Sequence, residues 1–141
     1  MSIYSIGRRT TGVTSGQGSM DVVMGASTRG KLMELSFTLG AATASTYGIN
    51  RPTAVGTRTT PVVLLAEDPG DPAALCDSAL AWSVQPTLAT DDLRRIGLPA
   101  TIGTGIIWTF PKGLVLAISA GVALVNRATN GVGDCHVVVD Q

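Results

Sequence analysis

The residue pattern closest to a known chemical motif is Gly25–Lys31, which matches the Gly-x-x-x-x-Gly-Lys part of a phosphate-binding loop. A working loop of that kind needs a hydroxyl side chain directly after the lysine to bind Mg²⁺, but Leu32 stands there. The residues that follow alternate with period 2, which predicts a strand and not a helix whose N-terminus faces a phosphate. We therefore expect a hairpin loop between two strands, and no nucleotide turnover that depends on Lys31.

Side chains suited to nucleophilic or metal chemistry are few and scattered. His136 is the single histidine, which excludes a multi-histidine metal centre, and a strand there would turn it away from Cys135. Cys76 and Cys135 make no spacing motif; their apolar neighbours favour buried free thiols, although a disulfide between them stays open. The acidic pairs adjoin Gly, Pro or Thr and are typical of turns, with a calcium site at Glu67–Asp71 as the alternative. The sequence thus predicts no catalytic residue, no metal ligand, no cofactor and no enzyme.

Two pairs of arginines are the candidate binding residues. Arg8 and Arg9 begin a segment rich in Gly and Thr, and we expect them to contact a partner protein. Arg94 and Arg95 would point to opposite faces of a strand at residues 93–98. Because an arginine on an apolar strand face is unusual, ion pairing at a subunit interface is favoured over simple solvent exposure.

Aromatic residues make up 4% of the chain, which is too few for a platform that stacks sugars or bases. Trp108 and Phe110 share one face of a predicted strand with Ile106. We expect both aromatic residues to be core anchors, and Trp108 to be largely buried.

The composition indicates one domain that associates with itself. The chain has 141 residues, and ten Lys and Arg balance ten Asp and Glu, so no net charge attracts nucleic acid or an anionic membrane. The longest nearly uncharged apolar run, Gly113–Val125, has 13 residues, whereas a membrane-spanning helix needs about 20. Charged residues are 14% of the total, against about 25% in typical domains. Subunit contacts explain this low charge most simply.

Short segments of period-2 alternation, with turn signals between them, predict an all-β sandwich or barrel. The expected strands are residues 31–39, 106–110, 114–118, 122–126 and 135–140, with a tight turn at Phe110–Gly113 and a hairpin signal at Asn130-Gly131. Residues 1–19 are expected to form an N-terminal strand and an extended Gly/Thr-rich arm, and residues 20–141 the domain. At most one short helix is expected, near residues 72–81, with Asp71 as its cap.

Several motifs together resemble a known family. They are Leu-Arg-Arg-Ile-Gly-Leu-Pro at 93–99, Gly-Ile-Ile-Trp-Thr-Phe-Pro-Lys-Gly-Leu at 105–114, Ala-Leu-Val-Asn at 123–126, and Ala-Ala-Thr-Ala-Ser-Thr-Tyr-Gly-Ile at 41–49 followed by Arg51-Pro52. This arrangement is similar to the small capsid cement (decoration) proteins of tailed bacteriophages, of cyanophage type, over most of the chain from about Met20. The resemblance implies a jelly-roll or β-sandwich core, a trimer, and a place on the outer capsid surface, where such proteins stabilise the shell against DNA pressure.

Together these observations predict an antiparallel, jelly-roll-like β-sandwich that forms a homotrimer and binds the major capsid protein. Its location would be the virion, on the capsid surface, after synthesis in the host cytoplasm. Arg8 and Arg9 are the candidate capsid contacts, and Arg94 and Arg95 the candidate subunit contacts. The alternative is a phage tail or fibre domain that binds host glycan, which aromatic residues at an exposed loop tip would favour.

Overall fold

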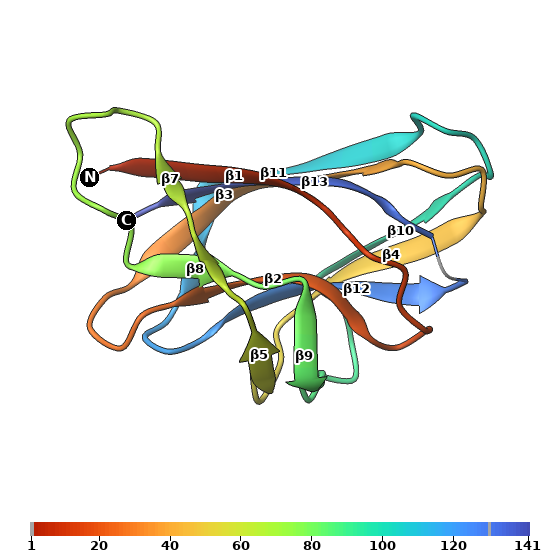
Figure 1. Cartoon of the computed structure of the whole chain (residues 1–141), viewed down its shortest axis with the longest axis horizontal. Helices are drawn as coiled ribbons and strands as arrows, with labels where there is room; N and C mark the ends of the chain where they lie inside the picture. The colour runs from red at the N-terminus through yellow and green to blue at the C-terminus, as the bar shows by residue number, and fades with distance from the viewer. Residues whose placement is uncertain (1, 130) are drawn as a thin grey trace.

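The computed structural model describes residues 2–129 and 131–141, and these form strands, turns and loops without a helix. Two antiparallel sheets pack face to face, and a two-stranded ribbon projects beside them (Figure 1). Sheet A has the strand order β11 (Gly105–Leu116), β3 (Gly30–Leu39), β13 (Gly133–Asp140), β1 (Ile3–Arg9) and β7 (Leu65–Ala66). Sheet B has the order β10 (Arg94–Leu98), β4 (Ser45–Asn50), β12 (Gly121–Ala128), β2 (Gly18–Met24), β8 (Cys76–Ser78) and β6 (Val62–Val63). The ribbon consists of β5 (Thr57–Thr59) and β9 (Ala81–Val84).

Eight of these strands follow the wrapping order of a jelly roll. The antiparallel pairs β1·β13, β2·β12, β3·β11 and β4·β10 are nested, as if one long hairpin had been rolled up. The chain crosses from one sheet to the other after β1, β2, β3, β10, β11 and β12. The predicted all-β, antiparallel, jelly-roll-like sandwich is therefore confirmed.

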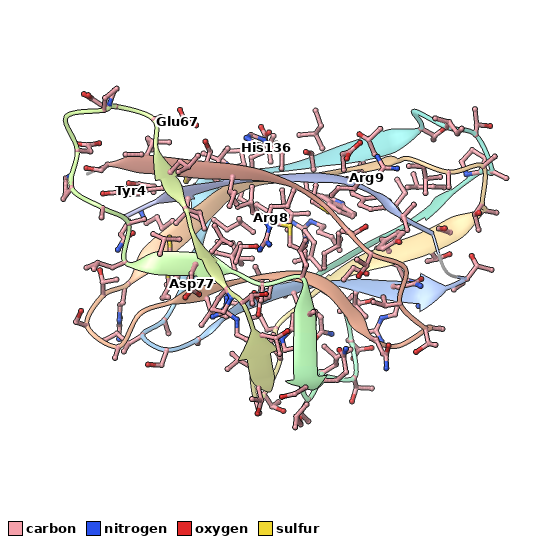
Figure 2. The ribbon with its side chains drawn as sticks, viewed as in Figure 1. Tyr4, Arg8, Arg9, Glu67, Asp77 and His136 are labelled. Carbon is pink, nitrogen blue, oxygen red and sulfur yellow. The ribbon has the colours of Figure 1, made fainter. Side chains whose placement is uncertain are left out.

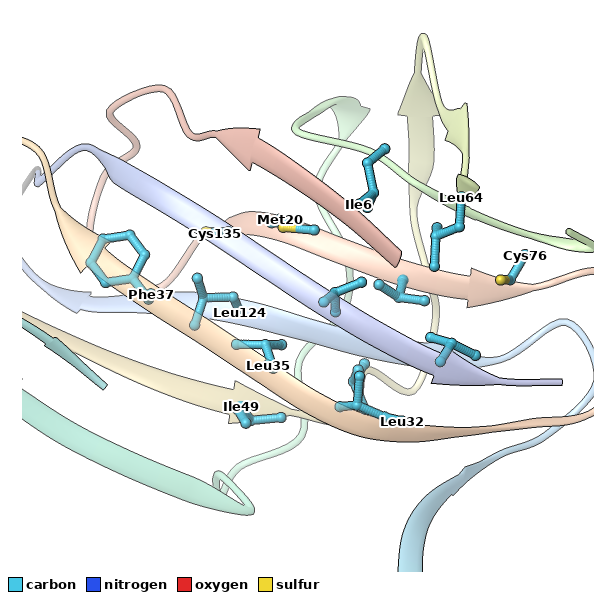
Figure 3. Close-up of a cluster of buried hydrophobic side chains, with 14 of the residues drawn as sticks. Ile6, Met20, Leu32, Leu35, Phe37, Ile49, Leu64, Cys76, Leu124 and Cys135 are labelled. Carbon is cyan, nitrogen blue, oxygen red and sulfur yellow. The ribbon is translucent and has the colours of Figure 1, made fainter. Parts of the chain in front are cut away.

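Alternate side chains of the two sheets meet between them to form the core (Figure 3). Leu35 and Phe37 project from β3 of sheet A, and Ile49 and Leu124 project from β4 and β12 of sheet B, all fully or almost fully buried. The rings of Phe37 and Tyr47 pack with their centroids 4.1 Å apart. Burial of each such side chain stabilises the fold by about 1.5–3 kcal/mol, so the period-2 alternation determines which face of each strand points inward.

The long segment at residues 51–93, between β4 and β10, wraps around one side of the sandwich. Its residues 62–66 pass from the edge of sheet B to the edge of sheet A, and Leu64 is inserted into the core on the way. The ribbon covers the outer face of sheet B, where a Cβ at Gly18 would lie 3.3 Å from both Trp82 and Pro86. As a result β2 is buried on both faces.

The segment predicted to be an extended arm is bound to the sandwich. Gly7–Arg9 belong to β1, which pairs with β13 along its whole length. In the loop at 10–17, the Gly16 N–H donates to the Asn126 carbonyl at 2.7 Å, and the Asn126 side-chain amide donates to the Val13 carbonyl at 2.8 Å. Hydrogen bonds to backbone groups thus hold this Gly- and Thr-rich stretch against β12. The prediction of an extended arm was wrong because amino-acid composition carries no information about such bonds.

The predicted tight turn at Phe110–Gly113 is a bulge inside one continuous strand, β11. Thr109 pairs with Glu34 and Leu114 with Leu32, so the residues between them are extra residues on one strand. Phe110 is buried, as expected of a core anchor, but Trp108 is only half-buried because it lies on an edge strand of its sheet.

Three other local predictions differ from the structure. Residues 72–81 contain strand β8 and no helical turn, because Cys76 and Asp77 pair with the end of β2. The loop after Met24 joins β2 of sheet B to β3 of sheet A, so it is a crossing between sheets and not a hairpin. Asn130 lies outside the described residues; the strands that flank the predicted hairpin there, β12 and β13, belong to different sheets.

Candidate functional site

The loops at 10–17, 40–44 and 99–104 gather at one end of the sandwich with residues 129, 131 and 132, on the right of Figure 1, and none of these residues is charged. We call this surface the uncharged end. The opposite end differs, because its loops carry Arg29, Glu67, Asp68 and Asp71. Interface cores are depleted in charged residues, so the uncharged end is the stronger candidate for a protein contact.

Hydrogen bonds between the loops hold the uncharged end in one arrangement. The Gly103 N–H donates to the Leu39 carbonyl at 2.9 Å, and the Gly40 N–H donates to the Val132 carbonyl at 2.9 Å. The buried hydroxyl of Tyr47 donates to the Gly131 carbonyl at 2.5 Å, and the Thr129 hydroxyl donates to the Ala44 carbonyl. A surface ordered in this way loses little conformational entropy when it binds.

The outermost side chains of this end are small or apolar. Ile102, at the tip of the β10–β11 loop, is 65% exposed and is the largest apolar side chain that these loops expose. Gly16 and Gly103 have φ values of +84°, and no neighbouring atom lies within 4 Å of where a Cβ would stand. A partner can therefore approach the backbone closely and cover Ile102 without desolvating a charge.

Arg8 and Arg9, the predicted capsid contacts, point in opposite directions from β1 (Figure 2). Arg8 points between the two sheets and donates to the Ser78 carbonyl at 2.6 Å. Arg9 lies on the outer face of sheet A, 3.3 Å from the Asp134 carboxylate, with both side chains more than half exposed. Arg9 is thus the member of the pair that a partner can reach, at the rim of the uncharged end.

Arg94 and Arg95 are both exposed on β10, an edge strand of sheet B. Arg94 lies 5.9 Å from the centre of the Phe110 ring and covers the open side of the core there. Arg95 is the next residue of the strand and so points to the opposite face, as predicted.

Sequence reasoning missed a buried ion cluster that fastens the ribbon to sheet B. Arg58 on β5 approaches Asp21 at 2.8 Å and Asp77 at 2.5 Å. Burial raises the pKa of Asp21, and the Arg58 charge with the hydrogen bond from the Ala79 N–H lowers it only in part. These residues are far apart in the chain, so no local pattern reports the cluster.

A second cluster joins the end of the 51–93 segment to β12. Arg127 donates to Asp92 through its Nε at 2.9 Å, and the Asn50 amide donates to the same carboxylate at 2.9 Å. Burial would raise the pKa of Asp92, but these hydrogen bonds outweigh it and hold that pKa below its usual range. In both clusters the charged groups are paired with other groups of the protein, so both clusters hold segments of the fold together.

The side chains of the cysteines, His136 and the acidic loop residues lie apart from one another in the fold. Cys76 and Cys135 are buried and free, and burial raises the pKa of the Cys76 thiol to about 11, so it is protonated at neutral pH. His136 is turned away from Cys135, as predicted, and lies 3.5 Å from Glu34 on the outer face of sheet A. In the Glu67–Asp71 loop, Asp68 accepts a hydrogen bond from the Gly70 N–H at 2.8 Å, as turn carboxylates do. Within residues 2–129 and 131–141, no group of His, Cys, Asp and Glu is placed to hold a metal ion.

No helix of the described residues is long and apolar enough to cross a membrane. No family model, curated protein or solved structure compared with this chain matches it.

Proposed function

We propose that this chain is a capsid cement protein of a tailed bacteriophage, which binds the outer surface of the shell as a homotrimer and stabilises it. The observation that carries the proposal is the uncharged end, where hydrogen-bonded loops without a charged residue of their own meet at one end of a jelly-roll sandwich. Jelly rolls are common in viral capsid domains, and the motifs at 93–99 and 105–114 resemble cement proteins. In this proposal the uncharged end faces the major capsid protein, with Ile102 as its exposed apolar contact and Arg9 at its rim.

The placement of the aromatic residues favours this function over glycan binding by a tail or fibre domain. All six aromatic residues lie in strands and are buried or half-buried. Trp82, for example, packs over Gly18, and Tyr47 donates to Gly131 inside the fold. Sugars usually stack on exposed aromatic rings, and the loops of the uncharged end present Thr, Ala, Gly and Ile in their place.

The low charge of the chain supports the homotrimer. Charged residues are 14% of the sequence, whereas the surface of a soluble monomer is about 25–35% charged. Arg95, on an exposed edge strand, is the proposed ion-pairing residue of the subunit contact. A closed three-fold assembly would match a three-fold position on an icosahedral shell.

The test is co-sedimentation with shells that are assembled from the major capsid protein of the same virus and lack this chain. The wild-type protein should bind saturably and raise the temperature at which the shells rupture. Ile102→Asp should weaken binding at least about tenfold, because it places a charge in the contact. Ile118→Asp is the matched control, since Ile118 is 47% exposed in a loop at the opposite end of the sandwich.

Two results would contradict the proposal. Wild-type protein that stays in the supernatant at micromolar concentration would reject shell binding. Light scattering that gives the mass of one chain at that concentration would reject the homotrimer.

A further inference from the structure

The edges of the two sheets differ in how they are protected from pairing with another strand. Exposed edges are usually shortened, charged, bulged or interrupted by proline, because their free backbone groups can pair with another chain. β6 and β7 have two residues each, and β10 carries Arg94 and Arg95. The second half of β11 contains the bulge, Pro111 and Lys112.

The first half of β11, Gly105–Thr109, has none of these features. Its sequence, Gly-Ile-Ile-Trp-Thr, is uncharged and consists mainly of residues that favour strands. In the described part of the chain, β3 is the one strand that pairs with β11, so the other edge is open. Ile107, at the middle, is 61% exposed on the outer face of sheet A.

The register shows which backbone groups are free on this edge. The Leu39 N–H donates to the Thr104 carbonyl at 2.8 Å, and hydrogen-bonded and non-hydrogen-bonded pairs alternate along an antiparallel ladder. Ile106 and Trp108 therefore direct their backbone groups toward β3. Gly105, Ile107 and Thr109 direct theirs outward, where five consecutive residues offer three donors and three acceptors to another strand.

We propose that this edge pairs with the same edge of a second copy of the chain, antiparallel, about a two-fold axis at Ile107. Each Ile107 would then exchange hydrogen bonds with its counterpart, and each Gly105 with the opposing Thr109, for about six new backbone bonds in all. The other edges of the chain are too short, too charged or too irregular to match five residues. A second copy of this segment has the five-residue length that this edge can pair with, carries no charge, and can run antiparallel to it.

The side chains of this register are compatible on both faces. On the outer face the two exposed Ile107 side chains cover each other, and the small Gly105 faces Thr109. On the inner face Ile106 lies opposite Trp108, an aromatic and β-branched pair that is favourable between strands. The contact also covers the half-buried Trp108. It is independent of shell binding, and on a shell it joins copies that belong to neighbouring trimers.

The test is disulfide formation by Ile107→Cys in the full chain. The proposed pair brings the Cα atoms of the two introduced cysteines to about 5.5 Å, which lies within the range that a disulfide spans. Under mild oxidation, paired strands should cross-link to a covalent dimer about a hundredfold faster than unpaired thiols at micromolar concentration. Val84→Cys is the matched control, because Val84 is 60% exposed on strand β9, and the native Cys76 and Cys135 are buried.

A second pair of variants tests the two-fold axis without any covalent bond. Ile107→Lys and Ile107→Glu should each keep the trimer but lose the concentration-dependent association of wild-type trimers with one another, because like charges face each other across the axis. An equimolar mixture should regain it. Equal cross-linking rates for Ile107→Cys and Val84→Cys, or a mixture that associates no better than either variant alone, would overturn the proposal. Neither result bears on shell binding, which the co-sedimentation test decides separately.

Discussion

At the scale of single residues, the charges that matter most for stability are the few that the fold buries. Arg58 lies between Asp21 and Asp77 and holds the ribbon against sheet B. Arg9 and Asp134 also form an ion pair, but on an open surface where water screens it. The same chemical pairing therefore has a different energetic value at the two places.

Arg58→Ala should lower the free energy of unfolding by about 3–5 kcal/mol, because it leaves the Asp21 carboxylate buried without its partner. Arg9→Ala should change that free energy by at most about 1 kcal/mol. Urea denaturation of both variants measures the difference, and equal losses would contradict the assignment.

The loss in Arg58→Ala should also depend on pH. Burial already raises the pKa of Asp21 in the folded state, so its protonation favours the fold, and stability falls as pH rises through that raised pKa. Without Arg58 the pKa rises further. The loss in the free energy of unfolding of Arg58→Ala should therefore become smaller as the pH is lowered toward the ordinary pKa of aspartate, because Asp21 is then protonated in both proteins. A loss that becomes larger at low pH would contradict this prediction.

At the scale of elements, the bulge determines the course of β11. Gly113 has a φ of +70°, and a Cβ there would lie 2.6 Å from the Cβ of Lys31 on β3. The bulge lets one long strand keep its inward face on the core although extra residues are inserted, and it brings Phe110 under Arg94. Glycine is thus required at position 113 for two reasons: the backbone has a positive φ, and Lys31 leaves no room for a Cβ.

Gly113→Ala should destabilise the protein through both effects. Gly103→Ala is the matched control, because Gly103 also has a positive φ, +84°, but open space around it. The control should cost about 1–2 kcal/mol for the backbone conformation alone. Gly113→Ala should cost about 1–3 kcal/mol more, because Lys31 must move. Thermal or urea unfolding measures the loss of stability in both variants. Equal losses would contradict the prediction, because they would mean that Lys31 moves away from the new Cβ without a loss of free energy.

At the scale of the whole molecule, the two ends of the chain are part of one sheet. β1 lies between β13 and β7, and Ser2 and Gln141 exchange backbone hydrogen bonds of 2.9 and 3.0 Å. The N-terminal segment is thus an inner strand of sheet A and contributes Tyr4 and Ile6 to the core. The outer loop at 10–17, in contrast, contributes mainly to the surface of the uncharged end.

Deletion of residues 2–9 should therefore prevent stable folding, because it opens the edge of β13 and exposes the core beneath β1. The double variant Thr11→Ala/Thr14→Ala changes two exposed side chains of the next loop and should keep the wild-type melting temperature. Circular dichroism of the two proteins distinguishes these outcomes. A deletion variant that melts like the wild type would mean that β1 is dispensable.

Much of the strand pattern could be predicted from the sequence because alternation is a local signal. The segment predicted at 31–39 corresponds to β3, and the one predicted at 135–140 lies within β13. Their inward faces follow from burying every second side chain, which requires no knowledge of the partner strand. The all-β class and the opposite orientations of Cys135 and His136 followed in the same way. The apolar neighbours of Cys76 and Cys135 favoured buried free thiols, as the structure has them, but left a disulfide between them open.

Only the tertiary structure decided which strands pair, and with them the surfaces that can act. The Gly- and Thr-rich stretch after Arg9 is held by backbone bonds to β12, and Arg58 meets Asp21 across 37 positions of the chain. The lack of charge in the loops of the uncharged end is visible in the sequence, but their meeting at one end follows from the jelly-roll crossings. The open edge at Gly105–Thr109 likewise depends on β11 being the last strand of its sheet. Such contacts join residues far apart in the chain and form only when the whole fold is assembled. They therefore produce no periodic pattern in the sequence from which they could be predicted.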